Sequence, residues 1–549
     1  MKQFFGKIFL PALFGLVPAM AMGQTAVDVI KMSGTDLRGT ARFMSMGGAF
    51  GALGGDFSVL DQNPGGIGVY RSSDVGVTVD FDAQSVKDGS GISVNQLRVN
   101  CNNFGYVGAF KLDSEVMPNL NIGFTYTRPV SFNRHYAGRI ASQTSSLTDY
   151  VASYTNAGKW GSQDLTNANP GKWDPYLDSN APWMSILSYN SGLIMPDSND
   201  RFHGLSGNDS QIGSEFEVTE TGGVDQFNIN FGWNISNVVF WGLGFGITNL
   251  DYKSTTYYGE TVTNGRIKHF VEDEQGRIYD TGRITDGDAS YGLVNSLHTF
   301  GSGWNFKLGV IVKPVNALRI GLAFHTPTYY SLKDESISYM SAEFTPYSSN
   351  AAGCIIEDNT NQGYLDEWWY KIRTPWRFIA SAAVVIGKKG IVSLDYERRN
   401  YSGAEYDDGS VMSNNSMKQD IKTLYRDVNI FRIGAEYRVL PQLSVRAGYC
   451  FEPGASSDVL YNDRAEVSTV STTPAYYADD CTKYLSCGLG YRYKNFYADL
   501  AYVHKKNEGE DHVFTSYTDP MVTPQTVESP ASKITATSNR VVATIGVRF

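Results

Sequence analysis

Charged residues occupy one face of the chain's most regular segments, in which apolar and polar side chains alternate. The face opposite the apolar side chains carries Lys307, Arg319, Arg377, Asp395, Glu397, Arg432 and Glu436. Both signs of charge are interspersed, so neighbouring side chains can pair across strands and with water. We therefore interpret these residues as groups that line and brace a polar interior, in preference to contacts with a specific substrate.

Catalytic and metal-binding patterns are the other chemistry to consider. A nucleophile needs a base within reach, yet the chain has no G-x-S-x-G, and the histidine predicted to face inward, His325, has no evident partner. No G-x-x-x-x-G-K-[ST] loop indicates nucleotide hydrolysis. The sequence predicts no enzyme, no cofactor and no metal site. The stretch 196–210 is rich in Asp and Asn; we interpret it as a solvated loop, with calcium binding as the alternative.

Cysteine usage gives little information. The five cysteines are an odd number, with no C-x-x-C and no metal-ligand spacing. Cys450 and Cys481 fall near the same end of neighbouring predicted strands, which leaves a disulfide open. Alternation points the first inward and the second outward, so unpaired cysteines are the favoured interpretation.

Alternation with a period of two recurs fourteen times, which is typical of strands with two different faces. The predicted strands lie near residues 74–82, 103–111, 119–127, 225–234, 238–251, 302–313, 317–328, 374–387, 390–400, 427–439, 442–451, 481–493, 495–505 and 538–549. Aromatic residues make up 13% of the chain and charged residues 19%, a balance that suits strands with one face in lipid. On that face an Arg or Lys at mid-depth would cost about 2 to 4 kcal/mol. The pattern predicts an all-β fold, a transmembrane antiparallel β-barrel of 14 strands over residues 74–549.

The connections between these strands alternate between short and long. Tight turns such as "ISN", "KPVN" and "GKKG" alternate with long polar links at 83–102, 128–224, 252–301, 329–373, 401–426, 452–480 and 506–537. Outer-membrane barrels have short periplasmic turns and long extracellular loops, whereas a soluble β-sandwich has no reason to sort its loops by side. The pattern predicts a protein of the outer membrane of a Gram-negative bacterium, with a long extracellular loop at about 128–224.

The residues before the first strand fall into two parts. Residues 1–23 contain two lysines, then an apolar run, then small residues, which is typical of a secretory signal peptide. Residues 24–73 are rich in glycine, and a barrel of fourteen strands is too wide for its own side chains to fill. We expect this segment to form a hatch in the lumen, with Phe50 and Phe57 among its gating residues.

A short stretch ends the predicted hatch. Asn63, Pro64, Gly65 and Gly66 predict a tight turn, because the proline fixes its own φ and a glycine is free to take a positive φ. We expect this turn to lead the chain out of the hatch and into the first strand.

Together these features resemble a known family. The segment "GTARFMSMGGAFGALGGD", the turn "DQNPGGI", the fourteen-strand pattern and the terminal Phe549 are similar to the FadL/TodX-type outer-membrane transporters of long-chain fatty acids and other hydrophobic compounds. The resemblance implies a fourteen-stranded barrel with an N-terminal hatch, and passive uptake of a fatty acid-like ligand by loop capture and hatch movement. Many members carry Asn-Pro-Ala where this chain has Asn63-Pro64-Gly65.

The resemblance also implies a kinked third strand that opens sideways into the membrane. Pro129 stands at the end of the third predicted strand, and proline lacks the N–H that continues a ladder. A lateral opening at Pro129 is one interpretation, and a strand that simply ends near residue 127 is the favoured one. A terminal aromatic residue such as Phe549 resembles the assembly signal read by the outer-membrane insertion machinery.

The expected partners are a hydrophobic small molecule, outer-membrane lipid and lipopolysaccharide, and the insertion machinery. A net charge of -10 argues against nucleic acid. The chain is too short for the roughly 22 strands and longer plug of a TonB-dependent receptor, so we expect no TonB coupling. A general porin for polar solutes is one alternative, although a porin needs no plug, and a surface adhesin or structural barrel is another. The ligand's identity stays open.

Overall fold

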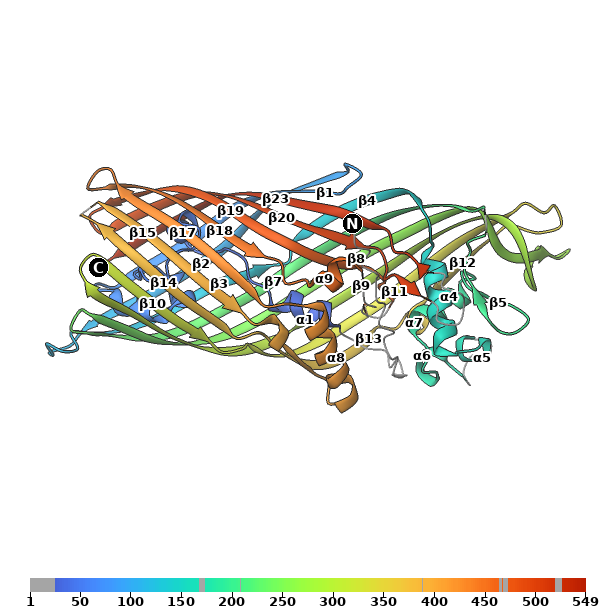
Figure 1. The fold of residues 1–549 in the computed structure, drawn as a ribbon, viewed down its shortest axis with the longest axis horizontal. Coiled ribbons are helices and arrows are strands. Elements are labelled where there is room, and N and C mark those ends of the chain that lie inside the picture. The colour runs from blue at the N-terminus through green and yellow to red at the C-terminus, as the bar shows by residue number, and fades with distance from the viewer. Residues whose placement is uncertain are drawn as a thin grey trace, which may run out of the picture.

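The chain folds into a long β-barrel with a small helical segment inside it (Figure 1). This computed structural model describes residues 25–166, 173–207, 209–387, 389–463, 467, 472–518 and 526–549. The predicted signal peptide, residues 1–23, lies outside the described residues. No helix in these ranges has the length and apolar character needed to cross a membrane.

Fourteen strands form the wall, and each pairs antiparallel with the next until the last closes on the first. In ring order they are β1 (Asp74–Lys87), β2 (Ser93–Lys111), β3 (Asn119–Ser131), β7 (Gln211–Ile235), β8 (Val239–Glu272), β9 (Ile278–Val315), β10 (Leu318–His325), β14 (Arg377–Ile386), β15 (Gly390–Arg399), β17 (Val428–Arg438), β18 (Leu443–Pro453), β19 (Tyr476–Tyr493), β20 (Phe496–His512) and β23 (Ala531–Arg548). β23 pairs with β1 along the whole of β1, which closes the barrel. The predicted fourteen-stranded antiparallel barrel is confirmed.

The two faces of the wall differ as the alternation predicted. Outward side chains such as Phe104, Phe306 and Leu394 are exposed, as befits a lipid-facing surface, whereas inward Lys307 and Asp395 are buried. A closed sheet leaves no strand edge in the hydrocarbon region, where each unpaired backbone group would cost several kcal/mol. The aromatic and aliphatic band therefore belongs to the membrane and the polar face to the lumen.

Several strands are much longer than the alternation indicated. β8 has 34 residues and β9 has 38, so most of 252–301 is a paired extension of the wall and not a link. The predicted link 83–102 is likewise mostly strand, because β1 and β2 stay paired up to Lys87↔Ser93. Beyond the membrane, neither face of a strand contacts lipid, so the apolar period that marks a membrane-spanning strand fades.

The predicted loop at 128–224 and the other long links are built up from short elements. They are β4 (Arg134–Gln143), α4 (Leu147–Gly158), α5 (Ser162–Leu165), α6 (Pro175–Asp178), α7 (Trp183–Asn190), β5 (Met195–Pro196), β6 (Phe202–His203), β11 (Tyr329–Pro346), β12 (Cys354–Asn359), η2 (Thr360–Gly363), β13 (Asp366–Arg373), η3 (Tyr401–Gly403), β16 (Glu405–Asp407), α8 (Val411–Leu424), α9 (Asp458–Tyr461), β21 (Tyr517–Thr518) and β22 (Thr526–Val527). Helices α4 to α7 gather at one end of the barrel (Figure 1). This is the end away from the short turns, which makes it the extracellular end.

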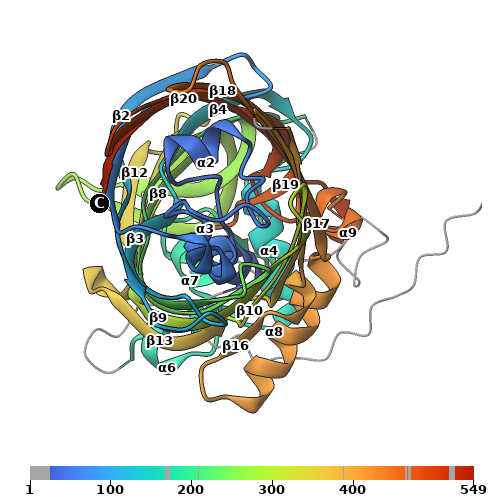
Figure 2. The ribbon, with the colours of Figure 1, turned by 90° about the vertical axis from the view of Figure 1, so that its left-hand side faces the viewer.

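The hatch lies inside the ring of strands (Figure 2). It contains α1 (Ala26–Ser33), α2 (Ala41–Ser45), α3 (Val59–Gln62) and η1 (Pro64–Val69). Thr40 caps α2 by accepting the Phe43 N–H on its side chain. Phe50 and Phe57 are fully buried and belong to an apolar cluster that the hatch shares with the wall.

The stretch Asn63–Gly66 differs from the predicted tight turn. The Asn63 side chain caps η1 by accepting the Gly65 N–H at 3.0 Å, and neither Gly65 nor Gly66 has a positive φ. A Cβ added to Gly65 would lie 2.9 Å from the Val310 Cα. The expectation of a positive φ was wrong here: glycine is required at this position because the backbone of the hatch touches the backbone of the wall.

Candidate functional site: the hatch and the wall around it

The C-terminal part of the hatch, residues 40–73, is called the hatch body here, and it is anchored by polar wall residues. The Asp395 carboxylate accepts the backbone N–H of Phe50 at 3.1 Å, that of Gly51 at 2.9 Å and the side-chain amide of Gln62 at 3.1 Å. Hydrogen bonds to an ionised carboxylate are among the stronger kind. One residue of β15 thereby fixes two separate stretches of the hatch body.

Three more of the predicted lumen residues also contact the hatch. Their partners are Asp61 for Lys307, the Leu53 carbonyl at 2.8 Å for Arg319, and Arg42 at 3.1 Å for Glu436. Asn63 adds a further tie, because its amide donates to the Gly51 carbonyl at 2.6 Å and to the Val310 carbonyl at 3.3 Å. The inward polar residues thus hold the hatch body in place as well as lining the lumen.

The other predicted lumen residues form a cluster within the wall. Glu397 is fully buried, and its carboxylate accepts hydrogen bonds at 2.7 Å from Arg377, Arg399 and Arg432. Arg399 also donates to Glu452 at 2.8 Å. These residues lie on β14, β15, β17 and β18, so the cluster ties four neighbouring strands together beside the hatch.

The N-terminal part of the hatch, residues 25–38, is called the hatch arm here. It is tied to the wall through Lys31, which pairs with Glu220 at 2.7 Å, and through Asp36. The Asp36 carboxylate pairs with Arg540 at 2.8 Å and with Lys505 at 3.2 Å, and it accepts the Tyr484 hydroxyl at 2.6 Å. Burial alone would raise the pKa of the Asp36 carboxyl, but the surrounding cations hold this pKa well below its usual range. An ionised aspartate therefore joins the arm to β19, β20 and β23.

The wall is interrupted beside the hatch arm. Within the described residues, β3 pairs with β2 only as far as Thr127↔Asn103, although β3 continues along β7 to Ser131. Both strands carry an irregularity at this level, in β2 between Asn103 and Cys101 and in β3 between Thr127 and Val130. A bulge bends its strand and re-aims it. The expectation that the strand ends near residue 127 was wrong: it bends at Pro129 and continues.

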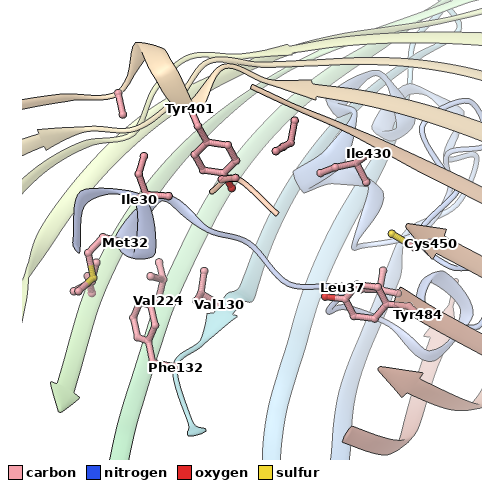
Figure 3. Packing of buried hydrophobic residues seen from close by; sticks show 14 of the residues in the cluster. Ile30, Met32, Leu37, Val130, Phe132, Val224, Tyr401, Ile430, Cys450 and Tyr484 are labelled. Carbon is pink, nitrogen blue, oxygen red and sulfur yellow. The ribbon is translucent and has the colours of Figure 1, made fainter. Parts of the chain in front are cut away.

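The hatch arm bridges this interruption. The Asp36 N–H donates to the Pro129 carbonyl at 2.8 Å. Figure 3 shows Val130 and Val224 below the arm, which passes from Met32 to Leu37 across the lumen, and all four side chains belong to one buried cluster. The residue that ties the arm to three strands on one side therefore also ties it to the kink of β3.

Two cavities flank the hatch arm, and both are lined by Pro129, Arg377 and Arg399. Each has a volume of about 60 Å³. A molecule of liquid water takes up roughly 30 Å³, and small-molecule sites usually measure about 300 to 1,000 Å³. The lumen beside the arm has room for a few waters, far less space than a small-molecule site.

The remaining predicted residues lie apart from this site. Phe549 is 63% exposed at the end of β23, and its N–H donates to the Ser73 carbonyl at 2.9 Å. Cys450 and Cys481 are both free cysteines. Across the described ranges, no three His, Cys, Asp or Glu side chains come together as they would around a metal ion.

An apolar-faced closed barrel with a packed hatch in its lumen defines a class, the plugged transport barrels of the outer membrane. A family model described as Outer membrane protein transport protein (OMPP1/FadL/TodX) matches residues 206–507, more than half of the chain. The chain belongs to this family. Members transport hydrophobic compounds through the outer membrane, and the predicted localisation is thereby confirmed.

Comparison with solved structures agrees with the fold. A FadL homologue of Pseudomonas aeruginosa aligns over 94% of this chain and 99% of its own, with a TM-score of 0.50 and 10% identity. The Pseudomonas putida toluene transporter TodX aligns over 94% and 99% with a TM-score of 0.44 and 12% identity, and the Ralstonia pickettii toluene transporter TbuX over 94% and 99% with 0.42 and 13%. No curated protein matches the chain.

Proposed function

We propose that the protein passively carries hydrophobic or amphipathic small molecules, with long-chain fatty acids or similar compounds as cargo, and releases them sideways between β2 and β3. The observation that supports this most directly is the end of the β2–β3 ladder at Thr127. The outward Arg128–Asp225 ion pair at 2.8 Å puts this interruption at the border of the lipid-facing band. Unpaired backbone that borders the hydrocarbon region is tolerated only where it meets water, protein or a bound molecule. At this interruption the covering group is the hatch arm, through the Asp36 N–H and the Pro129 carbonyl.

The path has three steps. The cargo is captured among the extracellular elements, reaches the lumen above the hatch, and displaces the hatch arm. Displacing the arm removes its bond to the Pro129 carbonyl and uncovers the interruption in the wall. The cargo then leaves along the apolar outer surface beside Phe104 and Phe124, both about half exposed. No energy-transducing partner is needed, because the cargo moves down its own gradient.

A reversible cross-link tests the lateral step. The β2–β3 register, in which Asn103 faces Thr127, would place natural Cys101 opposite position 129 if the ladder continued. We expect a short bis-maleimide between Cys101 and Pro129→Cys, with the other four cysteines changed to serine, to lower fatty acid uptake by cells several-fold. A disulfide between the same residues should do so until it is reduced.

The matched control carries Pro129→Cys with Cys101→Ser, so it takes up the reagent at one residue without forming a bridge. Uptake at the unmodified rate through a fully cross-linked barrel would rule out lateral release at Pro129.

The exposed terminal residue has a separate role in this proposal. Phe549 acts in assembly, as a contact for the insertion machinery, and takes no part in transport. Its removal should lower the folded, heat-modifiable fraction on gels while leaving uptake per folded molecule unchanged.

A further inference from the structure

The wall has a second interruption, away from Pro129. Within the described residues, β15 ends at Arg399 and its line continues only in the short β16, which pairs with β13 at Ile372↔Tyr406. β17 begins at Val428 and β18 ends at Pro453, and beyond them their lines meet only at the bridge Tyr425↔Ser456. On the far side β19 pairs with β20 up to Tyr476↔His512. Two missing strands leave three spacings of about 4.8 Å, a window about 14 Å wide between β16 and β19.

The window lies just outside the lipid-facing band. Outward side chains of β15 and β17 are apolar or aromatic as far as Tyr396 and Phe431, which stand opposite each other, and the next level carries the Arg398–Asp427 ion pair at 2.9 Å. Irregular backbone at this height is solvated, so it has no hydrocarbon penalty. The window therefore faces the headgroup and sugar region of the outer leaflet.

Helix α8 lies against the outside of the ring at this window, beside β16 and β17 (Figure 2). Hydrogen bonds hold it at its two ends: Asn414 donates to the Asp407 carboxylate at 2.9 Å, and the Ser457 N–H donates to the Leu424 carbonyl at 2.8 Å. Between the ends, Met417 and Ile421 are fully buried. Apolar side chains, and not a β-ladder, seal this part of the wall.

The surface behind α8 is the hatch arm. α8 packs against α1, and Met417 and Ile421 belong to the same buried cluster as Val29 and Ile30 of α1. The opposite face of α8 is exposed at Lys418, Gln419 and Lys422. One helix thus has a polar outer surface toward the outer leaflet and an apolar inner surface against the hatch arm.

We propose that α8 is a movable panel over a second side opening, through which amphipathic molecules of the outer leaflet reach the hatch arm directly. The hydrogen bonds at the two ends of α8 can stay in place while the helix opens. The free energy of opening is then that of the lost apolar contacts. Because α1 packs on the same contacts, opening the panel also loosens the arm. The identity of what passes rests on the proposed function, whereas the opening of the panel is tested independently of it.

The test measures how fast a membrane-impermeant maleimide added outside the cells labels a single cysteine, in a background with the five natural cysteines changed to serine. Val29→Cys reports on α1 behind the panel, and Val59→Cys, equally buried, reports on the hatch body. We expect Ile421→Asp to speed labelling at Val29→Cys more than about tenfold, because labelling follows the open population. Gln419→Asp, the same charge on the exposed face, should leave it unchanged, and Val59→Cys should stay protected.

A second variant guards against misfolding and tests the route. Cross-linking Asp407→Cys to Asn414→Cys, whose native side chains touch, should lock the panel, reverse the faster labelling and lower fatty acid uptake. Unchanged labelling in folded Ile421→Asp protein, or an equal rise at Val59→Cys, overturns the panel. Undiminished uptake by the locked protein overturns the route; if the Cys101–Pro129 cross-link also leaves uptake unchanged, the proposed function fails as well.

Discussion

Ion pairs with the wall hold both parts of the hatch, but the two parts differ in their other contacts. The hatch body, residues 40–73, touches the wall backbone to backbone: a Cβ on Gly65 would lie 2.9 Å from the Val310 Cα, and one on Gly68 would lie 2.5 Å from the Trp233 carbonyl oxygen. The hatch arm, residues 25–38, is held by the ion pairs of Asp36 and by apolar packing against α8 and β3.

This difference separates a fixed plug from a releasable one. Close backbone packing gives way only if many contacts are lost together, because the interior is dense and relaxes little. An ion-paired carboxylate can leave when water or a ligand replaces its partners. The body should therefore block the periplasmic end permanently while the arm controls the lateral path.

The largest expected effect comes from removing the arm and most of the body. Deleting residues 24–60 should leave a folded barrel that conducts ions in planar bilayers, because its polar lumen then opens from end to end. Deleting residues 25–38 alone should leave conductance low, since the body still fills the periplasmic end, but should speed hydrophobic uptake. A barrel that stays closed after the longer deletion would show that the hatch is not the plug.

Asp36→Asn should release the arm without touching the body. Breaking a buried ion pair from one side costs about 3 to 5 kcal/mol, and here it leaves Arg540 and Lys505 facing an amide. We expect several-fold faster labelling of a cysteine at Thr35 and faster uptake. Asp499→Asn is the matched control, because Asp499 is a buried wall aspartate whose ion pair, with Arg446 at 2.6 Å, involves no arm residue; an equal effect from both variants would assign the change to the loss of a buried ion pair and not to the arm.

Gly65→Ala should act on stability and not on the path. The added Cβ meets wall backbone that cannot shift away from it. Overpacking of this kind lowers the free energy of unfolding by about 1 to 3 kcal/mol. The thermal transition of the purified barrel, followed by heat-modifiable migration, should move to lower temperature while uptake per folded molecule stays unchanged. Faster uptake in this variant would contradict the claim that the arm, and not the body, controls the path of the cargo.

The pH dependence should be the smallest effect. The pKa of Asp36 is held well below its usual range, so its stabilisation of the arm is fully present above the unfolded pKa of about 3.9 and is lost only as pH falls through the lower folded value. Uptake, and the ratio of arm labelling to the labelling of an exposed reference cysteine, should therefore stay flat as pH falls from 7 to about 4.5. A release of the arm within that range would show that another group controls it.

The wall was predictable from the sequence because alternation repeats locally. Within each strand the apolar–polar alternation indicates which side faces lipid. Residues such as Asp395 and Glu397 could therefore be placed inward from their sequence neighbours alone. The extensions of β8 and β9 were missed for the converse reason. Beyond the membrane no lipid imposes the alternation, so the sequence of a paired strand there cannot be told from that of a polar loop.

The site was less predictable because its contacts join distant residues. Asp36 meets Lys505 and Arg540, hundreds of positions away, and only the closure of the barrel brings them together. A signal was present nevertheless, since Asp36 is a charge within a segment of small and apolar residues, and such a charge needs a partner when buried. The sequence indicated that Pro129 interrupts the pairing of its strand. It did not indicate that the Pro129 carbonyl accepts a hydrogen bond from the arm.

Two distances measured by pulsed electron paramagnetic resonance test the central claim most directly. One spin label stays at Val315, near the periplasmic end of β9, and the second stands either at Thr35 in the arm or at Val69 in the body. On adding a long-chain fatty acid to the full-length protein, the Thr35 to Val315 distance should lengthen and broaden while the Val69 to Val315 distance keeps its width. Two distances that shift together, or an arm that does not move with ligand bound, would contradict a releasable arm on a fixed body.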